Sequence, residues 1–191
     1  MTPSFLRGER IDLRPLVEAD ADGPYVSWFN DADTCRGNSH HVRPYSAADA
    51  RAYIARVAAA PDQLVLAIER REDGRHIGNI ALQAINPVYR TAELSIMVGE
   101  RDAWGQGYAS EAARLLCDHG FRALNLNRIG CGTFAGNGGM RRVAARLGMR
   151  EEGVRRQAAF KDGAYVDVVE YGVLRAEYES ARVAAESREA A

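Results

Sequence analysis

The sequence predicts an α/β chain of the mixed α+β kind, with one mostly antiparallel sheet flanked by helices. Three observations support this class. Strand-like and helix-like periodicities are interspersed along the whole chain. The turns Glu72-Asp73-Gly74 and Lys161-Asp162-Gly163 each separate two strand-like runs, which is typical of hairpins. A length of 191 residues suits one domain with a proper core, so we expect a single domain over residues 1–191.

The first third of the chain predicts one strand, two helices and a long irregular segment. Arg10–Arg14 alternates between apolar and polar residues, as a half-buried strand does. Glu18–Phe29 is helix-like, and Ser46 is a suitable N-cap for a second helix over Ala47–Ala59. Between these helices, Asn30–Tyr45 is polar and irregular, which is typical of a functional loop.

The middle of the chain predicts three strands, a glycine turn and a helix that begins near Tyr108. The expected strands are Gln63–Glu69, His76–Ile85 and Thr91–Val98. Small and apolar residues then recur at helical spacing, so this helix is expected to lie close to the sheet. They are Ala109, Ala112, Ala113, Leu116, Gly120, Phe121 and Leu124.

The last third predicts three more strands, which brings the sheet to about seven, and two helices. The strands are Arg128–Phe134, Arg150–Phe160 and Tyr165–Leu174. A short helix over Asn137–Leu147 ends at Gly148, a typical C′ glycine. The tail, residues 175–191, favours helix and is expected to fray at its end.

Composition restricts the partners and the compartment that we expect. The formal net charge of −1 gives no electrostatic reason to expect nucleic acid or an anionic membrane as partner. The longest apolar runs are too short to span a bilayer, and the first residues carry no signal-peptide core. Cys35, Cys117 and Cys131 show no metal-ligand spacing. We therefore expect a reduced, cytoplasmic protein without a metal.

The stretch Asp102–Glu111 carries the clearest chemical signal. Gly105 and Gly107 stand in a turn between a strand and a helix, where backbone N–H groups and the helix dipole can hold an anion. A dinucleotide fingerprint is excluded because Ser110 stands where its third glycine belongs, and no Gly-Lys-Ser/Thr sequence of a triphosphate-binding loop is present. The turn therefore predicts a phosphate or diphosphate site of another kind.

The run Trp104-Gly105-Gln106-Gly107-Tyr108-Ala109 resembles the pyrophosphate motif of the GNAT superfamily of acyl-CoA-dependent N-acetyltransferases. The longer form, Trp-Gly-x-Gly-Tyr-Ala-x-Glu-Ala, is similar to the RimJ/RimL branch, which acetylates N-terminal amines of ribosomal proteins. The resemblance covers about residues 8–174, the expected core of the domain. Further matching segments stand in the family's order: Trp28-x-Asn30-Asp31, His76–Asn79, Ala92–Leu94, Leu126–Ile129, Asn137, Leu147–Met149 and Glu152-Gly153.

This resemblance implies acetyl-CoA as the cosubstrate, bound where two neighbouring strands splay apart. The backbone of Ile96–Val98 would pair with the pantetheine arm, and the backbone N–H near Val98 would polarise the thioester carbonyl. Asn137, at a helix start, is either an ordinary N-cap or a CoA contact. The implied cofactor-binding residues are Ile96, Met97, Val98, Trp104, Gly105, Gln106, Gly107, Tyr108, Ala109, Ser110 and Asn137.

Glu93 is the candidate catalytic base, because it begins the strand before the turn, where members of the superfamily often place a carboxylate. Alternation puts Glu93, Ser95 and Met97 on one face of this strand. The residues alone also allow a solvated or ion-paired edge carboxylate. The usual tyrosine acid of the superfamily is replaced by Ala144, and a serine of RimJ/RimL-like chains by Met140.

The acceptor is expected to be a primary amine, either at a protein N-terminus or on a small molecule. A nucleotide-linked amino sugar of polysaccharide synthesis and a non-catalytic acyl-CoA-sensing role are the alternatives. The sheet edges make a homodimer plausible. The candidate acceptor-binding residues are Trp28, Asn30, His40, His41 and Arg43, although the two histidines also suit surface or structural roles.

Overall fold

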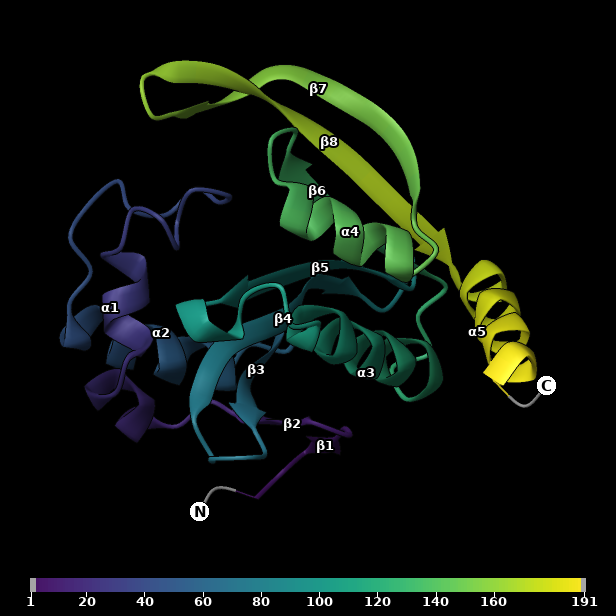
Figure 1. Ribbon diagram of the computed structural model, residues 1–191, viewed down its shortest axis with the longest axis horizontal. Helices are drawn as coiled ribbons and strands as arrows, with labels where there is room; N and C mark the ends of the chain where they lie inside the picture. The colour runs from purple at the N-terminus through teal and green to yellow at the C-terminus, as the bar shows by residue number, and fades with distance from the viewer. Residues whose placement is uncertain (1–2, 190–191) are drawn as a thin grey trace.

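The computed structural model describes residues 3–189, which contain one open sheet of eight strands (Figure 1). The strand order is β1-β2-β3-β4-β5-β6-β8-β7, and among these strands β5 and β6 form the one parallel pair. This arrangement confirms the predicted mixed, mostly antiparallel sheet. The strands are β1 (Leu6–Arg7), β2 (Ile11–Pro15), β3 (Leu64–Arg70), β4 (His76–Asn86), β5 (Thr91–Val98), β6 (Arg128–Phe134), β7 (Arg150–Lys161) and β8 (Ala164–Leu174).

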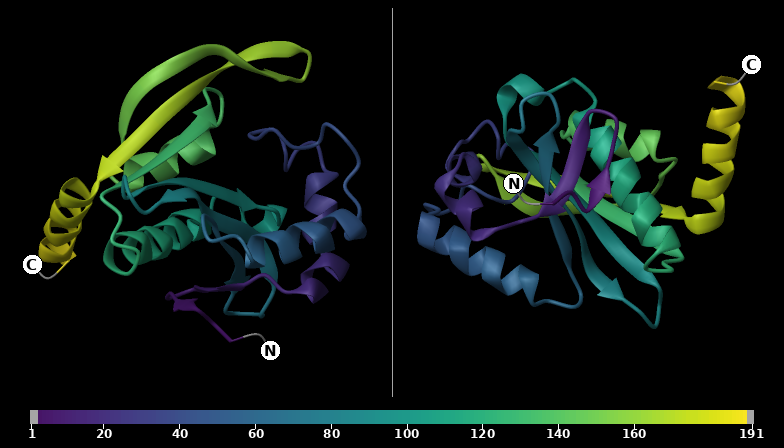
Figure 2. Two further views of the ribbon diagram at one scale, coloured as in Figure 1. Left: turned by 180° about the vertical axis from the view of Figure 1, so that it is seen from behind. Right: turned by 90° about the horizontal axis from the view of Figure 1, so that it is seen from below.

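Helices cover both faces of the sheet. In Figure 1, α3 and α4 lie in front of it, over the larger hydrophobic core. Seen from behind in Figure 2, α2 crosses the opposite face, where a second apolar cluster lies. No helix within residues 3–189 has the length and apolarity needed to cross a membrane. The helices are η1 (Glu18–Asp22), α1 (Tyr25–Phe29), α2 (Ala47–Ala58), η2 (Arg101–Ala103), α3 (Tyr108–Arg122), α4 (Gly138–Arg146) and α5 (Arg175–Glu189).

Two local predictions about helices are confirmed by their contacts. Ser46 caps α2, accepting a bond from the Asp49 N–H (3.2 Å), while the Asp49 carboxylate accepts one from the Ser46 N–H (2.9 Å). Gly120 of α3 lies so close to the sheet that a Cβ there would stand 3.0 Å from a methyl carbon of Leu82 and 3.1 Å from one of Ile129. The predicted small face therefore does bring α3 against the sheet, whereas Leu124 lies beyond the helix end and is exposed.

The N-terminal region differs from the prediction in two ways. Residues 18–29 form η1 and α1 instead of one helix, because Pro24 lacks an N–H and disfavours helical backbone at Gly23 before it. The eighth strand, β1, has two residues, too few to show any periodicity. The tail forms α5 as far as Glu189, and the last two predicted tail residues lie outside the described part.

The sheet forks between β5 and β6. Their parallel pairing is limited to three residue pairs, Thr91–Arg128, Ala92–Ile129 and Glu93–Gly130. Beyond Glu93, β5 continues to pair with β4 as far as Val98, and β6 continues to pair with β8 as far as Phe134. The facing edges of the two strands are therefore unpaired with each other beyond this point, as the resemblance implies.

A buried ionic cluster joins η1 to the sheet. Arg14 donates two bonds to the Asp20 carboxylate (2.9 and 2.8 Å), and His76 Nδ1 lies 3.4 Å from Asp20 Oδ1. All three side chains are buried. Burial by itself would raise the pKa of Asp20, but the interactions with His76 and Arg14 outweigh it and hold this pKa well below its usual value.

We expect Asp20→Asn to lower the free energy of unfolding by about 3–5 kcal/mol at pH 7, because Arg14 would keep a buried charge without its partner. The folded-state pKa of Asp20 is depressed, so its contribution is present above the unfolded pKa of ~3.9 and is lost as the pH falls toward the folded pKa. Urea unfolding at pH 7 and in acid should show the two proteins converging in acid. Asp22→Asn, at an exposed ion pair, is the matched control. Equal stabilities of wild type and Asp20→Asn at pH 7 would contradict the expectation.

Candidate active site

Both glycines of the predicted turn have left-handed backbone conformations. Gly105 has φ +73° and Gly107, the N-cap of α3, has φ +88°. Among the residues described, none accepts a hydrogen bond from the N–H groups of residues 105–109. These donors and the positive end of the α3 dipole form an array that fits a diphosphate. The turn can therefore hold a diphosphate.

A clamp between Arg10 and Glu111 fixes the turn. The buried Glu111 carboxylate accepts bonds from the Arg10 backbone N–H (2.9 Å) and from its Nε (3.2 Å). Arg10 Nη1 donates to the Gln106 carbonyl (3.0 Å), and its guanidinium lies 4.8 Å from the centre of the Tyr108 ring. The sequence interpretation missed this clamp, although Glu111 belongs to the motif, because Arg10 lies 101 residues away.

Trp104 connects the turn to the end of β5. Its indole N–H donates to the Val98 carbonyl (2.8 Å). The side chains of Ile96 and Val98 pack against the larger core and that of Met97 against the second cluster. Trp104 therefore supports the turn through the backbone of β5, and the pairing of this strand with a pantetheine arm stays a prediction.

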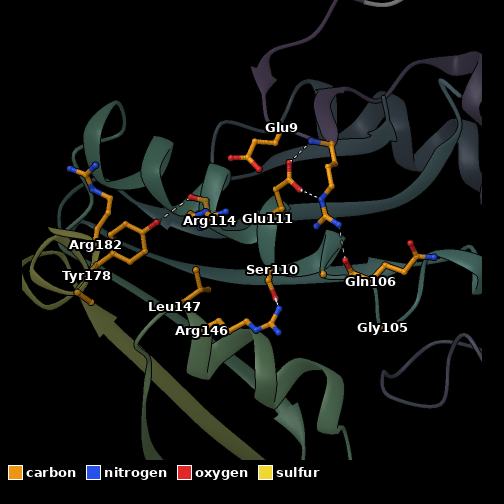
Figure 3. A pocket seen from close by; sticks show the side chains of 13 residues that line it. Glu9, Gly105, Gln106, Ser110, Glu111, Arg114, Arg146, Leu147, Tyr178 and Arg182 are labelled. Carbon is orange, nitrogen blue, oxygen red and sulfur yellow. Dashed lines mark hydrogen bonds and ion pairs between the residues drawn. The ribbon is translucent and has the colours of Figure 1, made fainter. Parts of the chain in front are cut away.

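A pocket of about 570 Å³ opens beside the turn (Figure 3). Gly105, Gln106, Gly107 and Ser110 line one side of it, and Ser110 accepts a bond from Arg146 (3.3 Å) at the end of α4. Four of the predicted cofactor-binding residues are thus brought together around one cavity. Its remaining walls come from segments that the sequence interpretation did not associate with the turn.

Glu93 lies at the fork of the sheet, with its side chain exposed. Ala92 and Leu94 point into the larger core, so alternation directs Glu93 to the opposite face, together with Ser95 and Met97. The Glu93 carboxylate makes no hydrogen bond or ion pair with the side chains and backbone that the structure describes. An exposed, unpaired carboxylate at this point can act as a proton acceptor.

The strand next to Glu93 carries two glycines on the same face, between Arg128 and Phe134. Gly130 pairs with Glu93, and Gly132 follows two residues later along β6. The Glu170 carboxylate of β8 lies beside Gly132, 3.0 Å from where its Cβ would be, and is paired with Arg155 (2.7 Å). A shallow strip of backbone therefore lies between two carboxylates, Glu93 and Glu170.

Cys131 is the thiol nearest in sequence to this strip, but it points into the core and is buried. Burial, together with the negative charges of Glu170 and Glu93, raises the pKa of the Cys131 thiol to about 12. The thiol therefore stays protonated at neutral pH and is a poor nucleophile.

The irregular segment Asn30–Tyr45 is closed at its ends by one side chain. The Asn30 amide donates to the Tyr45 carbonyl (2.7 Å) and accepts from the Tyr45 N–H (2.9 Å). We name this pair of bonds the Asn30–Tyr45 clasp. Asn30 therefore organises the segment, and a direct contact of Asn30 with an acceptor stays a prediction.

The other candidate acceptor residues have different surroundings. Trp28 is buried in the second cluster and donates to Glu100 (2.8 Å), which indicates a core role. His40 lies against Phe29, and partial burial and the charge of Lys161 lower its pKa. His40, His41 and Arg43 share a shallow pocket on the segment. The structure brings these three together, and their binding of an acceptor stays a prediction.

Asn137 has two structural partners. Its Oδ1 caps α4 by accepting from the Met140 N–H (3.1 Å), and its Nδ2 donates to the Gly37 carbonyl (3.1 Å). The neighbouring Asn38 lies 3.6 Å from the Met97 sulfur. The Asn30–Tyr45 segment thus contacts both arms of the fork, α4 next to β6 and the end of β5.

We expect two Asn137 variants to separate these roles. Asn137→Asp retains the oxygen that caps α4 but loses the donor to Gly37, whereas Asn137→Ala loses both. The alanine variant should be less stable by about 1 kcal/mol than wild type, and the aspartate variant should recover the part due to the cap. Thermal unfolding measures how much the cap contributes to stability. Hydrogen exchange over residues 30–45 should rise in both variants, and unchanged exchange would contradict the tether.

The two positions at which the family resemblance implies a tyrosine and a serine hold Ala144 and Met140, and neither side chain can donate a proton. Ala144 is fully buried, and Met140 packs against the larger core. Tyr108 is also buried, with its ring beneath Arg10. Within residues 3–189, no group of three or more His, Cys, Asp or Glu side chains is arranged to hold a metal ion.

A family model described as an acetyltransferase (GNAT) domain matches residues 10–150. The chain belongs to the GNAT family. It is therefore an acyl-CoA-dependent acetyltransferase, and the matched segment includes the strand, the glycine turn at Gly105–Gly107 and the helix described above.

The relatives are named as N-acetyltransferases, and two of the names state different acceptors. The uncharacterized N-acetyltransferase YoaA of Bacillus subtilis is 29% identical over 174 residues, covering 90% of this GNAT chain and 97% of YoaA. The putative ribosomal N-acetyltransferase YdaF of the same species is 34% identical, covering 56% and 58%. Spermidine N(1)-acetyltransferase of Escherichia coli is 30% identical and covers 56% of each chain. The chain thus spans just over half the length of the two relatives whose names state an acceptor.

Solved GNAT structures have the same architecture. A putative acetyltransferase from T. thermophilus superposes with a TM-score of 0.78 over 98% of both chains, at 27% identity. Spermidine N-acetyltransferase from Vibrio cholerae, solved with CoA and spermine, superposes with a TM-score of 0.79 over 90% of this chain and 99% of that one. Because the identity with the Vibrio cholerae enzyme is 22%, this similarity shows only that the fold is shared.

Proposed function

We propose that this protein transfers the acetyl group of acetyl-CoA directly to a primary amine, with Glu93 as the general base. The observation that carries the proposal is the exposed, unpaired Glu93 carboxylate at the fork of β5 and β6. Acetyl-CoA, when bound, supplies the acetyl group as a thioester. The turn at residues 105–109 would hold its diphosphate, and the free edge of β5 at Ile96–Val98 would hold its arm.

Glu93 would take the proton that the amine must lose. An aliphatic amine with a pKa near ~10.4 is almost fully protonated at neutral pH, whereas an α-amine near ~7.7–8.0 is partly neutral. A carboxylate at the fork can accept this proton directly or through water. The need for Glu93 is therefore greater for an aliphatic amine than for a protein N-terminus.

Direct transfer is favoured over an acetylated enzyme. The buried Cys131, with its pKa raised to about 12, is unsuited to attack a thioester. With Ala144 and Met140 at the usual acid positions, the departing thiolate would take its proton from water or from the product ammonium.

A small cationic amine is the acceptor that the site favours. On this face of the sheet Arg155 is paired with Glu170 and Arg128 with Glu152, so the unpaired Glu93 carboxylate is the group that can attract a cationic chain over Gly130 and Gly132. The similarity to the E. coli spermidine enzyme supports this class. The Trp104-Gly105-Gln106-Gly107-Tyr108 motif and the similarity to YdaF support a RimJ/RimL-like peptide amine as the second candidate.

A nucleotide-linked amino sugar receives less support. Arg36 is paired with Asp33, and Arg90 donates to the Asn125 carbonyl (2.7 Å) at the paired end of β5. Neither arginine is placed to hold the phosphates of such an acceptor at the fork.

Release of free thiol from acetyl-CoA tests the proposal. The panel consists of spermidine, a peptide with a free N-terminus and a nucleotide-linked amino sugar, and the mass of each product is measured. We expect release with spermidine and a mass gain of one acetyl group. If CoA binds and stabilises the protein but no amine releases thiol, the acyl-CoA-sensing alternative is supported instead.

A further inference from the structure

The pocket beside the glycine turn extends well past the turn itself. Its far walls are formed by Arg114 on α3, by Arg146 and Leu147 at the end of α4, and by Tyr178, Ala181 and Arg182 on α5. Figure 3 shows Arg114, Arg146, Leu147, Tyr178 and Arg182 around the cavity, carried by three different helices. Arg114 is seven residues beyond Gly107, which places its Cα about 10 Å further along the helix axis.

The C-terminal helix is held in place as a wall of this pocket. The Tyr178 hydroxyl donates to the Arg114 carbonyl (3.3 Å), and the Tyr178 ring packs 5.0 Å from that of Phe121. Tyr178 is buried in this contact. The position of Arg182, one turn further along α5, is thereby fixed relative to α3.

Positive charge in the pocket exceeds negative charge. Four arginines line it against two glutamates, Glu9 and Glu111, and Glu111 is already paired with Arg10. Among the described side chains, no carboxylate is paired with Arg114 or Arg146, and Arg146 donates to Ser110 (3.3 Å). A concave site with this charge selects a ligand with more negative charge than a diphosphate at the turn provides.

We propose that Arg114 and Arg146 bind the 3′-phosphate on the ribose of CoA. The inference rests on the proposed placement of the CoA diphosphate at the turn. A phosphomonoester dianion offers the oxygens that guanidinium groups bind in pairs, and Leu147 and Ala181 supply apolar surface for the attached nucleoside. The two arginines thus make the donor site selective for CoA over its 3′-dephospho form, and α5 closes the far wall of the pocket through Tyr178.

Calorimetric titration with CoA and with 3′-dephospho-CoA tests this assignment. Wild type should bind CoA about 10- to 100-fold more tightly, because contacts between charged partners are lost with the phosphate. Arg114→Gln combined with Arg146→Gln should weaken CoA binding toward the 3′-dephospho-CoA value and leave 3′-dephospho-CoA binding nearly unchanged. Arg122→Gln, on the same helix but outside the pocket, is the matched control and should retain the full preference.

The outcomes separate this inference from the proposed function. Equal affinities of wild type for the two ligands would overturn the 3′-phosphate site while leaving the diphosphate site intact. Equal losses of both affinities in the double variant would also overturn it, because the arginines would then act on a shared part of the ligands. If neither ligand binds wild type, the proposed donor site fails, and this inference fails with it.

Discussion

Replacing Glu93 with glutamine is expected to lower kcat for acetylation of spermidine at pH 7 by about 10²- to 10⁴-fold, the range of general-base catalysis. Glutamine retains the size and the exposed position of Glu93 but accepts no proton. The Kd for CoA should change little, because the side chain lies on the face of β5 opposite the core that supports α3. Steady-state thiol release and calorimetry measure the two quantities.

The pH profile distinguishes a base from a structural residue. The deficit of Glu93→Gln should shrink as the pH rises toward the pKa of the amine, ~10.4 for an aliphatic amine, because neutral acceptor is then supplied by solution. Glu151→Gln, on the exposed β7 strand, is the control for loss of a carboxylate elsewhere. Equal kcat values of wild type and Glu93→Gln at pH 7 would exclude Glu93 as the base.

Gly107→Val is expected to raise the Kd for CoA by about 10- to 100-fold. A β-branched side chain is disfavoured at φ +88°, and its Cβ would stand 3.2 Å from an Arg10 guanidinium nitrogen, so the N–H array and its clamp would both be disturbed. Calorimetric titration with CoA measures the effect.

A variant at a second glycine separates the effect of backbone strain from a loss of CoA binding. Gly163 has φ +83° in the turn between β7 and β8, and a Cβ there meets no atom within 4 Å. Gly163→Val should therefore lose comparable stability through its backbone but retain CoA affinity. An unchanged Kd in a folded Gly107→Val protein would argue against a diphosphate at the turn.

Local features of the fold were predictable because they depend on neighbouring residues. The Ser46 cap, both glycine hairpins and the small face of α3 are each encoded within one segment. Pro24 also carried a local signal against a continuous helix over residues 18–29, which the apolar spacing obscured.

The site was predictable only where it lies within one motif. Gly105, Gly107 and Ser110 belong to one motif, and they line one cavity. Arg14, Asp20 and His76 form a buried cluster. Sequence patterns predict such residues at the surface, because charged side chains are buried only when tertiary partners are present. The arginines from α3, α4 and α5 meet for the same tertiary reason.

The Asn30–Tyr45 clasp has a consequence for how this protein can change over evolutionary time. Because one side chain joins the two ends of the segment, residues 31–44 form a closed loop whose ends stay together whatever its length. Insertions and deletions in its exposed stretch, residues 40–43, can therefore leave α1 and α2 where they are. The loop that is proposed to contact the acceptor can thus vary in length and sequence while its two ends stay joined.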